Sequence, residues 1–141
     1  MKKTTIIIIF LSILFSCKKK NENNCTITAA AIAGSYKITA VTYKASATSP
    51  ETDYFNILFE PCERDDVYTF NADGTYQLAD VGMICTPSGS DNGTWSLTGT
   101  TVMTIDGDPV TLESFDCKQL ILVNTDTQAA GDKLKLTLTR Q

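Results

Sequence analysis

Most of the chain after residue 34 alternates between apolar and polar side chains, as a strand with one buried face does. In residues 133–140, for example, three leucines alternate with lysines and threonines. The pattern predicts eight strands, at residues 35–44, 66–71, 75–81, 93–98, 101–105, 109–115, 118–125 and 133–140. A helical pattern occurs only in residues 26–33, which predict one or two helical turns that Gly34 can end.

Short turns rich in glycine, asparagine and aspartate connect most of these strands, for example at residues 71–74 and 106–108. Such links permit only antiparallel neighbours and therefore a meander. Closing the meander hides its apolar face and removes both sheet edges. We therefore expect an all-β fold, an eight-stranded antiparallel up-and-down barrel after a short helical turn. Residues 45–61 are the longest irregular stretch, and their aromatic side chains indicate that part of it packs.

The first residues have the pattern of a secretory signal peptide. Lys2 and Lys3 precede an apolar run at residues 6–15, which is far shorter than the roughly 20 residues of a bilayer span. The alternative is an N-terminal core strand or helix. The position of the run and the polar residues 18–24 after it favour a signal peptide at residues 1–16.

The end of this segment resembles a bacterial lipobox, with Leu14 at −3, Ser16 at −1 and then Cys17. The resemblance implies that Cys17 becomes the lipidated N-terminus and attaches the protein to a membrane. Lys18 stands where an inner-membrane retention signal would have aspartate, so we expect an outer-membrane lipoprotein, on its periplasmic or surface face. Residues 17–25 would be the lipidated cysteine and a polar tether, and residues 26–141 the barrel domain.

Cleavage after residue 16 would remove two lysines and change the net charge from −4 to −6. An acidic exported domain argues against a nucleic-acid partner. Four cysteines would remain in this domain, and export favours disulfides over free thiols. Zinc is disfavoured because the chain has no histidine and no closely spaced cysteine pair.

The meander topology selects one disulfide pairing. With the first strand running upward, Cys62 and Cys85 lie at the top of the barrel, and Cys25 and Cys117 at the bottom. A disulfide joins Cα atoms about 4.4–6.8 Å apart, whereas a strand spans roughly 17–20 Å. We therefore expect the pairs Cys62–Cys85 and Cys25–Cys117.

Candidate chemistry is sparse. Asp65, Asp66 and Asp73 invite a cation site or a pair of catalytic carboxylates, but Asp73 suits a tight turn and no EF-hand spacing is present. Nucleophilic catalysis lacks its usual base because there is no histidine. We expect no enzymatic activity, no metal and no cofactor.

The barrel interior leaves two alternatives open, because eight strands can enclose either packed side chains or one small ligand. Tyr36, Tyr68 and Trp95 would fill the interior or line a cavity. A cavity mouth would lie at the top, between residues 45–61 and 85–92. The candidate lid residues there are Tyr54, Phe55, Leu58 and Phe59. Simple packing over the barrel end is the alternative for these four.

Several stretches resemble a known family. The segment CERDDVYTFNADGTYQL, then Cys85, NGTWSL and a leucine-rich last strand are similar to the lipocalin-like domain of small Bacteroidetes-type lipoproteins. GSYKITAV resembles the opening Gly-x-Trp segment of that family, with Tyr36 in place of tryptophan. The similarity covers about residues 30–140 and implies a small β-barrel related to lipid carriers, but no particular ligand.

Two functions therefore remain open. One is an anchored lipoprotein whose barrel binds a small apolar ligand. The other is a non-enzymatic scaffold or inhibitor, with a filled barrel, that contacts a protein or a glycan.

Overall fold

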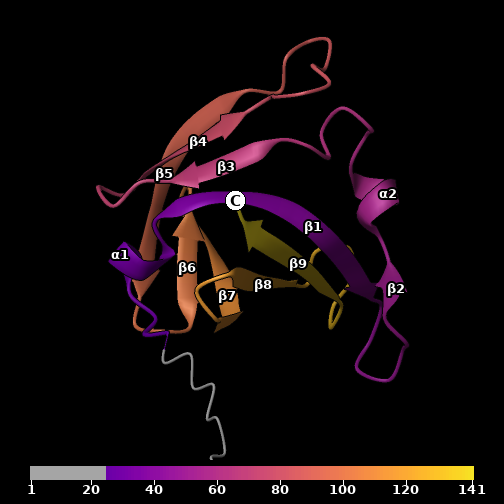
Figure 1. The fold of residues 1–141 in the computed structure, drawn as a ribbon. Helices are drawn as coiled ribbons and strands as arrows, with labels where there is room; N and C mark the ends of the chain where they lie inside the picture. Colours follow the sequence, from indigo (N-terminus) through magenta and orange to yellow (C-terminus); the bar gives the residue numbers. More distant parts are fainter. Residues whose placement is uncertain (1–24) are drawn as a thin grey trace, which may run out of the picture.

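The computed structural model describes residues 25–141 as one antiparallel sheet with two short helices (Figure 1). The strands are β1 (Gly34–Lys44), β2 (Thr52–Asp53), β3 (Val67–Phe70), β4 (Thr75–Ala79), β5 (Asp91–Thr98), β6 (Val102–Ile105), β7 (Asp108–Phe115), β8 (Gln119–Thr125) and β9 (Lys133–Arg140). The helices are α1 (Ala29–Ile32) and α2 (Phe55–Leu58). Within residues 25–141, neither helix is long and apolar enough to cross a bilayer.

The sheet closes on itself because β1 pairs with both β3 and β9. The ring contains eight strands in chain order, which confirms the predicted antiparallel barrel. The ninth strand, β2, pairs only with the end of β1. The alternation pattern did not reveal β2 or α2 within residues 45–61, because segments of two and four residues are too short to show a period.

One seam of the ring is short. β1 pairs with β3 over three residues, from Gly34 to Tyr36, whereas its ladder with β9 extends from Tyr36 to Lys44. Beyond Tyr36, β1 leaves β3, and its far end pairs with β2 instead. The two strands diverge visibly in Figure 1.

Two disulfides lie at opposite ends of the barrel. We call the end where β1 begins the bottom and the end where it finishes the top. Cys25 and Cys117 are joined at the bottom, with Cα atoms 5.6 Å apart, and Cys62 and Cys85 at the top, with Cα atoms 5.3 Å apart. These are the two pairs that the meander topology predicts.

Large aromatic side chains from β1, β3, β4 and β5 pack together inside the barrel. The Phe70 ring lies 5.9 Å from the Tyr36 ring, 6.1 Å from that of Tyr76 and 5.4 Å from that of Trp95. The Trp95 indole Nε1 donates a 2.8 Å hydrogen bond to the Asn71 carbonyl oxygen. Each ring buries a large apolar area, so the interior beside these four strands is a solid core.

The inward side chains become more exposed toward the top. In β9, Leu138 is 3% exposed, whereas Leu136 and Leu134, one and two levels higher, are only half-buried. In β6, Met103 is fully buried and Ile105 is half-buried. The barrel is therefore closed at the bottom and open at the top.

Candidate ligand-binding cavity

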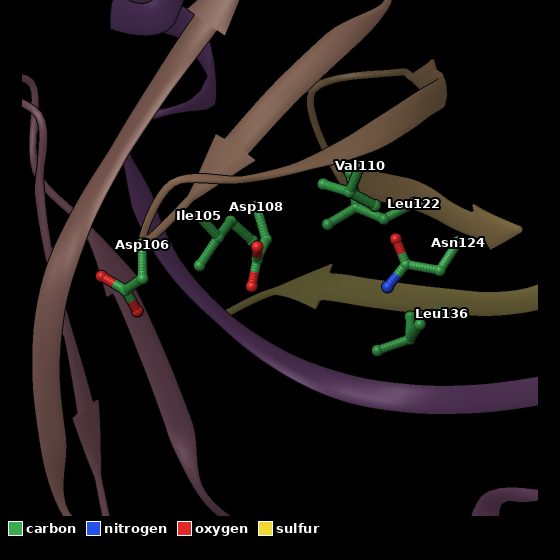
Figure 2. Close-up of a pocket in the computed structure, with 7 residues that line it drawn as sticks. All are labelled: Ile105, Asp106, Asp108, Val110, Leu122, Asn124 and Leu136. Atoms are coloured by element: carbon green, nitrogen blue, oxygen red, sulfur yellow. The ribbon is translucent and has the colours of Figure 1, made fainter. Parts of the chain in front are cut away.

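A cavity of about 310 Å³ occupies the top half of the barrel (Figure 2). Four apolar and three polar residues line it. They are Ile105, Val110, Leu122, Leu136, Asp106, Asp108 and Asn124. Its volume is at the small end of the range for ligand pockets, which is about 300–1,000 Å³.

The wall follows from the period of two in neighbouring strands. Ile105, Val110, Leu122 and Leu136 come from β6, β7, β8 and β9 in that order, and Leu122 and Leu136 are direct cross-strand partners. Alternate residues of a strand share one face, so the pattern that builds the core also makes this wall apolar. The side chains here are aliphatic rather than aromatic, and they leave space that the aromatic rings fill at the bottom.

The rim is built on the tight turn between β6 and β7. Asp106, in this turn, has a φ of 52° and its carboxylate accepts two hydrogen bonds. The Tyr76 hydroxyl donates to Oδ2 at 2.5 Å, and the Thr94 amide donates to Oδ1 at 2.8 Å. Gly93 permits this contact, because a Cβ atom there would lie 2.1 Å from Asp106 Oδ1 and 2.7 Å from Tyr76 Cε1.

This hydrogen bond shifts both pKa values. The hydrogen bond to Asp106, together with burial, raises the pKa of Tyr76 to about 12. The same bond and the Thr94 amide lower the pKa of Asp106. At neutral pH the tyrosine is protonated and the aspartate is charged, so the rim is negative.

The other two polar groups are Asp108 on β7 and Asn124 on β8. Figure 2 shows the Asp108 carboxylate beside Ile105, and the Asn124 amide between Leu122 and Leu136. Asn124 is half-buried and Asp108 is exposed. An apolar wall with a few polar groups is the usual composition of a small-molecule site.

The interior aromatic residues considered as ligand contacts lie elsewhere. Tyr36 is fully buried at the bottom, and its hydroxyl donates a 2.6 Å hydrogen bond to the Ile32 carbonyl oxygen. Trp95 is in the aromatic cluster around Phe70, and Tyr68 is half-buried on β3. None of the three lines the cavity. Tyr36 and Trp95 fill the barrel.

The candidate lid residues also lie outside the cavity lining. The Tyr54 ring packs 4.8 Å from the Tyr43 ring, at the upper end of β1. The ring of Phe55 on α2 lies 5.7 Å from that of Phe59, the residue after the helix, and Leu58 is 41% exposed. The core is contacted by three of these residues, Tyr54, Phe55 and Phe59. This contact agrees with simple packing over the barrel end, the alternative to a lid.

The residues that do line the cavity were not singled out from the sequence. One signal for them exists: the alternation that places Leu120 and Leu122 inward also places Asn124 inward. An amide at an inward position of an otherwise apolar strand face indicates either a local hydrogen bond or an internal site.

The acidic residues weighed as a cation site organise loops instead. The carboxylates of Asp65 and Asp66 accept hydrogen bonds from the Met83 and Val81 amides. Asp73 accepts one from the Thr75 amide within its turn. Across residues 25–141, no three His, Cys, Asp or Glu side chains are grouped as a metal site. Cys17, the predicted lipidation site, lies outside the described residues.

Comparison with known proteins adds a family. The model of a family described as lipocalin-like domain matches residues 32–123. The solved structure of a redesigned beta barrel is similar at 19% identity, over 82% of this chain and 96% of that chain, with a TM-score of 0.37. No curated protein sequence gives a significant match.

Proposed function

Because the chain belongs to the lipocalin-like domain family, we propose that it is a binding protein that holds a small apolar ligand in the top cavity of its barrel. The proposal is of binding rather than catalysis. It includes attachment to the outer membrane through a lipid on Cys17.

The observation that carries the proposal is the contrast between the two halves of the barrel. Buried aromatic rings fill the half beside β3, β4 and β5, whereas the half between β6 and β9 contains a cavity lined by four aliphatic side chains. In a barrel needed only as a scaffold, larger inward side chains would fill the top and add stability. When an apolar ligand covers apolar surface that is open to solvent, the removal of that area from water favours binding.

The position of the cavity suits an anchored protein. Cys25, eight residues after Cys17, is bonded to Cys117 at the bottom of the barrel. With Cys17 in the membrane, the bottom would face the lipid and the cavity would face away from it. A ligand would then enter from the aqueous side.

Ligand binding is tested with the neutral fluorescent probe N-phenyl-1-naphthylamine on the full chain. We expect saturable binding that is lost in Leu136→Trp and in Ile105→Trp, because either indole would fill the cavity. Ile57→Trp is the matched control, since Ile57 is 68% exposed on α2 and outside the cavity. Circular dichroism checks the fold of each variant. Equal probe binding by folded Leu136→Trp and the wild type would contradict the proposed site.

Membrane attachment is tested by Cys17→Ser in cells. We expect the variant to lose its lipid and to move from the outer-membrane fraction to the soluble fraction. Retention of the folded variant in that membrane fraction would contradict anchoring at Cys17.

A second candidate function is contact with another protein through exposed apolar side chains. Ile57 and Leu58 on α2 are 68% and 41% exposed, and Met83 and Ile84 beside Cys85 are 59% and 58% exposed. Exposed apolar side chains that gather into one patch mark interaction sites. Native mass spectrometry of protein extracted from its own envelope separates the two functions: a small bound mass supports ligand carriage, and a second polypeptide supports the scaffold.

A further inference from the structure

The polar groups of the cavity are unevenly charged. Of its seven lining residues, two are aspartates and one is an asparagine, and none is lysine or arginine. The nearby lysine Lys135 bonds instead to Glu51 and Glu113, each at less than 3.5 Å, at a separate depression on the outer surface. The cavity therefore presents negative charge and amide dipoles to whatever enters.

The three polar groups are not equally available. Asp106 already accepts hydrogen bonds from Tyr76 and Thr94. Within residues 25–141, by contrast, the side chains of Asp108 and Asn124 make no hydrogen bond with another residue, and both face the cavity. An unpaired amide against an apolar wall is costly to desolvate unless the ligand pairs with it.

We infer that the cavity selects an amphiphilic amine: an apolar molecule with a cationic head that donates hydrogen bonds to the Asp108 carboxylate and the Asn124 side-chain oxygen. The apolar part of the ligand lies on the aliphatic wall formed by Ile105, Val110, Leu122 and Leu136. This inference rests on the proposed ligand-binding function and names the chemical class of the ligand.

The same arrangement rejects fatty acids. A ligand carboxylate at this position would lie among two carboxylates, Asp106 and Asp108, with no cation on the cavity wall to pair with it. Like charges in a partly desolvated site disfavour binding, and such repulsion is a common source of specificity. An uncharged alcohol can donate to the same acceptors but lacks the charge attraction, so it is expected to bind with intermediate affinity.

The test compares three ligands with the same tail, namely octylamine, octan-1-ol and octanoate, by calorimetry and by displacement of N-phenyl-1-naphthylamine. At neutral pH and low salt, we expect octylamine to bind about tenfold more tightly than octanoate, the size of one charge-assisted hydrogen bond. The preference should weaken as salt is added, because the mouth is open to solvent.

Two variants locate the selectivity. Asp108→Asn should reduce the preference for octylamine over octanoate to about threefold or less. Asn124→Leu should weaken the binding of both octan-1-ol and octylamine, because it removes the side-chain oxygen that accepts their hydrogen bonds. Glu60→Gln is the charge-matched control, because it removes one exposed carboxylate outside the cavity lining and should change nothing.

The outcomes are distinguishable. If neither the probe nor any octyl ligand binds, the proposed function itself fails. If the probe binds but octanoate binds as tightly as octylamine, the amine inference is wrong while ligand binding stands. If octylamine is preferred equally by the wild type and Asp108→Asn, the head group is bound elsewhere and the assignment to Asp108 is wrong.

Discussion

Arg140, the last residue of β9, holds Tyr36 of β1 through both its ring and its hydroxyl. The guanidinium carbon is 5.2 Å from the Tyr36 ring centroid, and Nη2 donates a 2.6 Å hydrogen bond to the phenolic oxygen. The same guanidinium carbon also lies 5.7 Å from the centroid of the Phe115 ring. The pair joins the first and last strands where the barrel closes.

Arg140 also fastens α1 to the barrel bottom. Its Nη2 donates hydrogen bonds to the Ile32 and Ala33 carbonyl oxygens, at 3.3 and 3.2 Å. Tyr36 donates to the Ile32 oxygen as well. Carbonyl groups at the end of a helix otherwise have no partner, so this one side chain satisfies several of them.

Removing Arg140 should open the bottom of the barrel. We expect Arg140→Ala to lower the free energy of unfolding by about 2–4 kcal/mol, since charged hydrogen bonds and a cation–π contact are lost together. Tyr36→Phe keeps the ring and should cost about 1 kcal/mol. Urea unfolding measures both. Because the cavity is at the other end, probe binding by the folded variants should stay at the wild-type level; a large loss would mean that the two ends are coupled.

Asp132 is predicted to make stability depend on acid pH. Its side chain is fully buried and accepts hydrogen bonds from the backbone amides of residues 127, 128 and 129 and from the Tyr43 hydroxyl. Burial alone would raise its pKa, but these hydrogen bonds outweigh burial and lower the pKa from 3.8 to about 2.

The pKa of Asp132 is lower in the folded than in the unfolded state, so its ionisation stabilises the fold at pH values above the unfolded pKa of 3.8. This stabilisation is lost as the pH falls toward 2. Asp132→Asn should therefore be less stable than the wild type at pH 6, and the difference should shrink between pH 4 and pH 2. Urea unfolding at a series of pH values measures it, with the exposed Asp91→Asn as control. A difference that stays constant down to pH 2 would contradict the assignment to Asp132.

The hydrogen bond between Tyr76 and Asp106 should be visible in a tyrosine titration. Asp106→Asn removes the carboxylate that raises the pKa of Tyr76 to about 12, so that pKa should fall toward 10. Absorbance near 295 nm follows the change against the wild type. Gly93→Ala should lower the same pKa, because the added methyl group displaces Asp106 from Tyr76. An unchanged titration in both variants would mean that the bond is absent in solution.

The two disulfides should contribute unequally to stability. Cys25–Cys117 spans 92 residues of sequence and Cys62–Cys85 spans 23. In the chain-entropy model, these loops correspond to about 4.5 and about 3.5 kcal/mol. We expect Cys25→Ser/Cys117→Ser to lose more stability in urea than Cys62→Ser/Cys85→Ser. Peptide mapping without reductant checks the pairing itself, and a Cys25–Cys62 peptide would contradict it.

The sequence by itself determined the eight strands of the ring, the closed antiparallel barrel and the disulfide pairing. These features depend on local information: a period of two sets which side chains face inward, and short turns allow only antiparallel neighbours. Once the direction of each strand is known, each cysteine is placed at one end of the barrel. The pairing Cys62–Cys85 then follows from distance alone.

Only the tertiary structure decided which end is open and which residues line the cavity. The side chains at one level come from strands far apart in the sequence, and the space left depends on their combined volume. Phe70 and Trp95 meet and fill the interior between their strands, whereas Val110, Leu122 and Asn124 leave a cavity between theirs. No single strand shows the combined volume of the side chains at one level. The sequence pattern therefore pointed to the aromatic residues, and not to Asn124, as the ligand contacts.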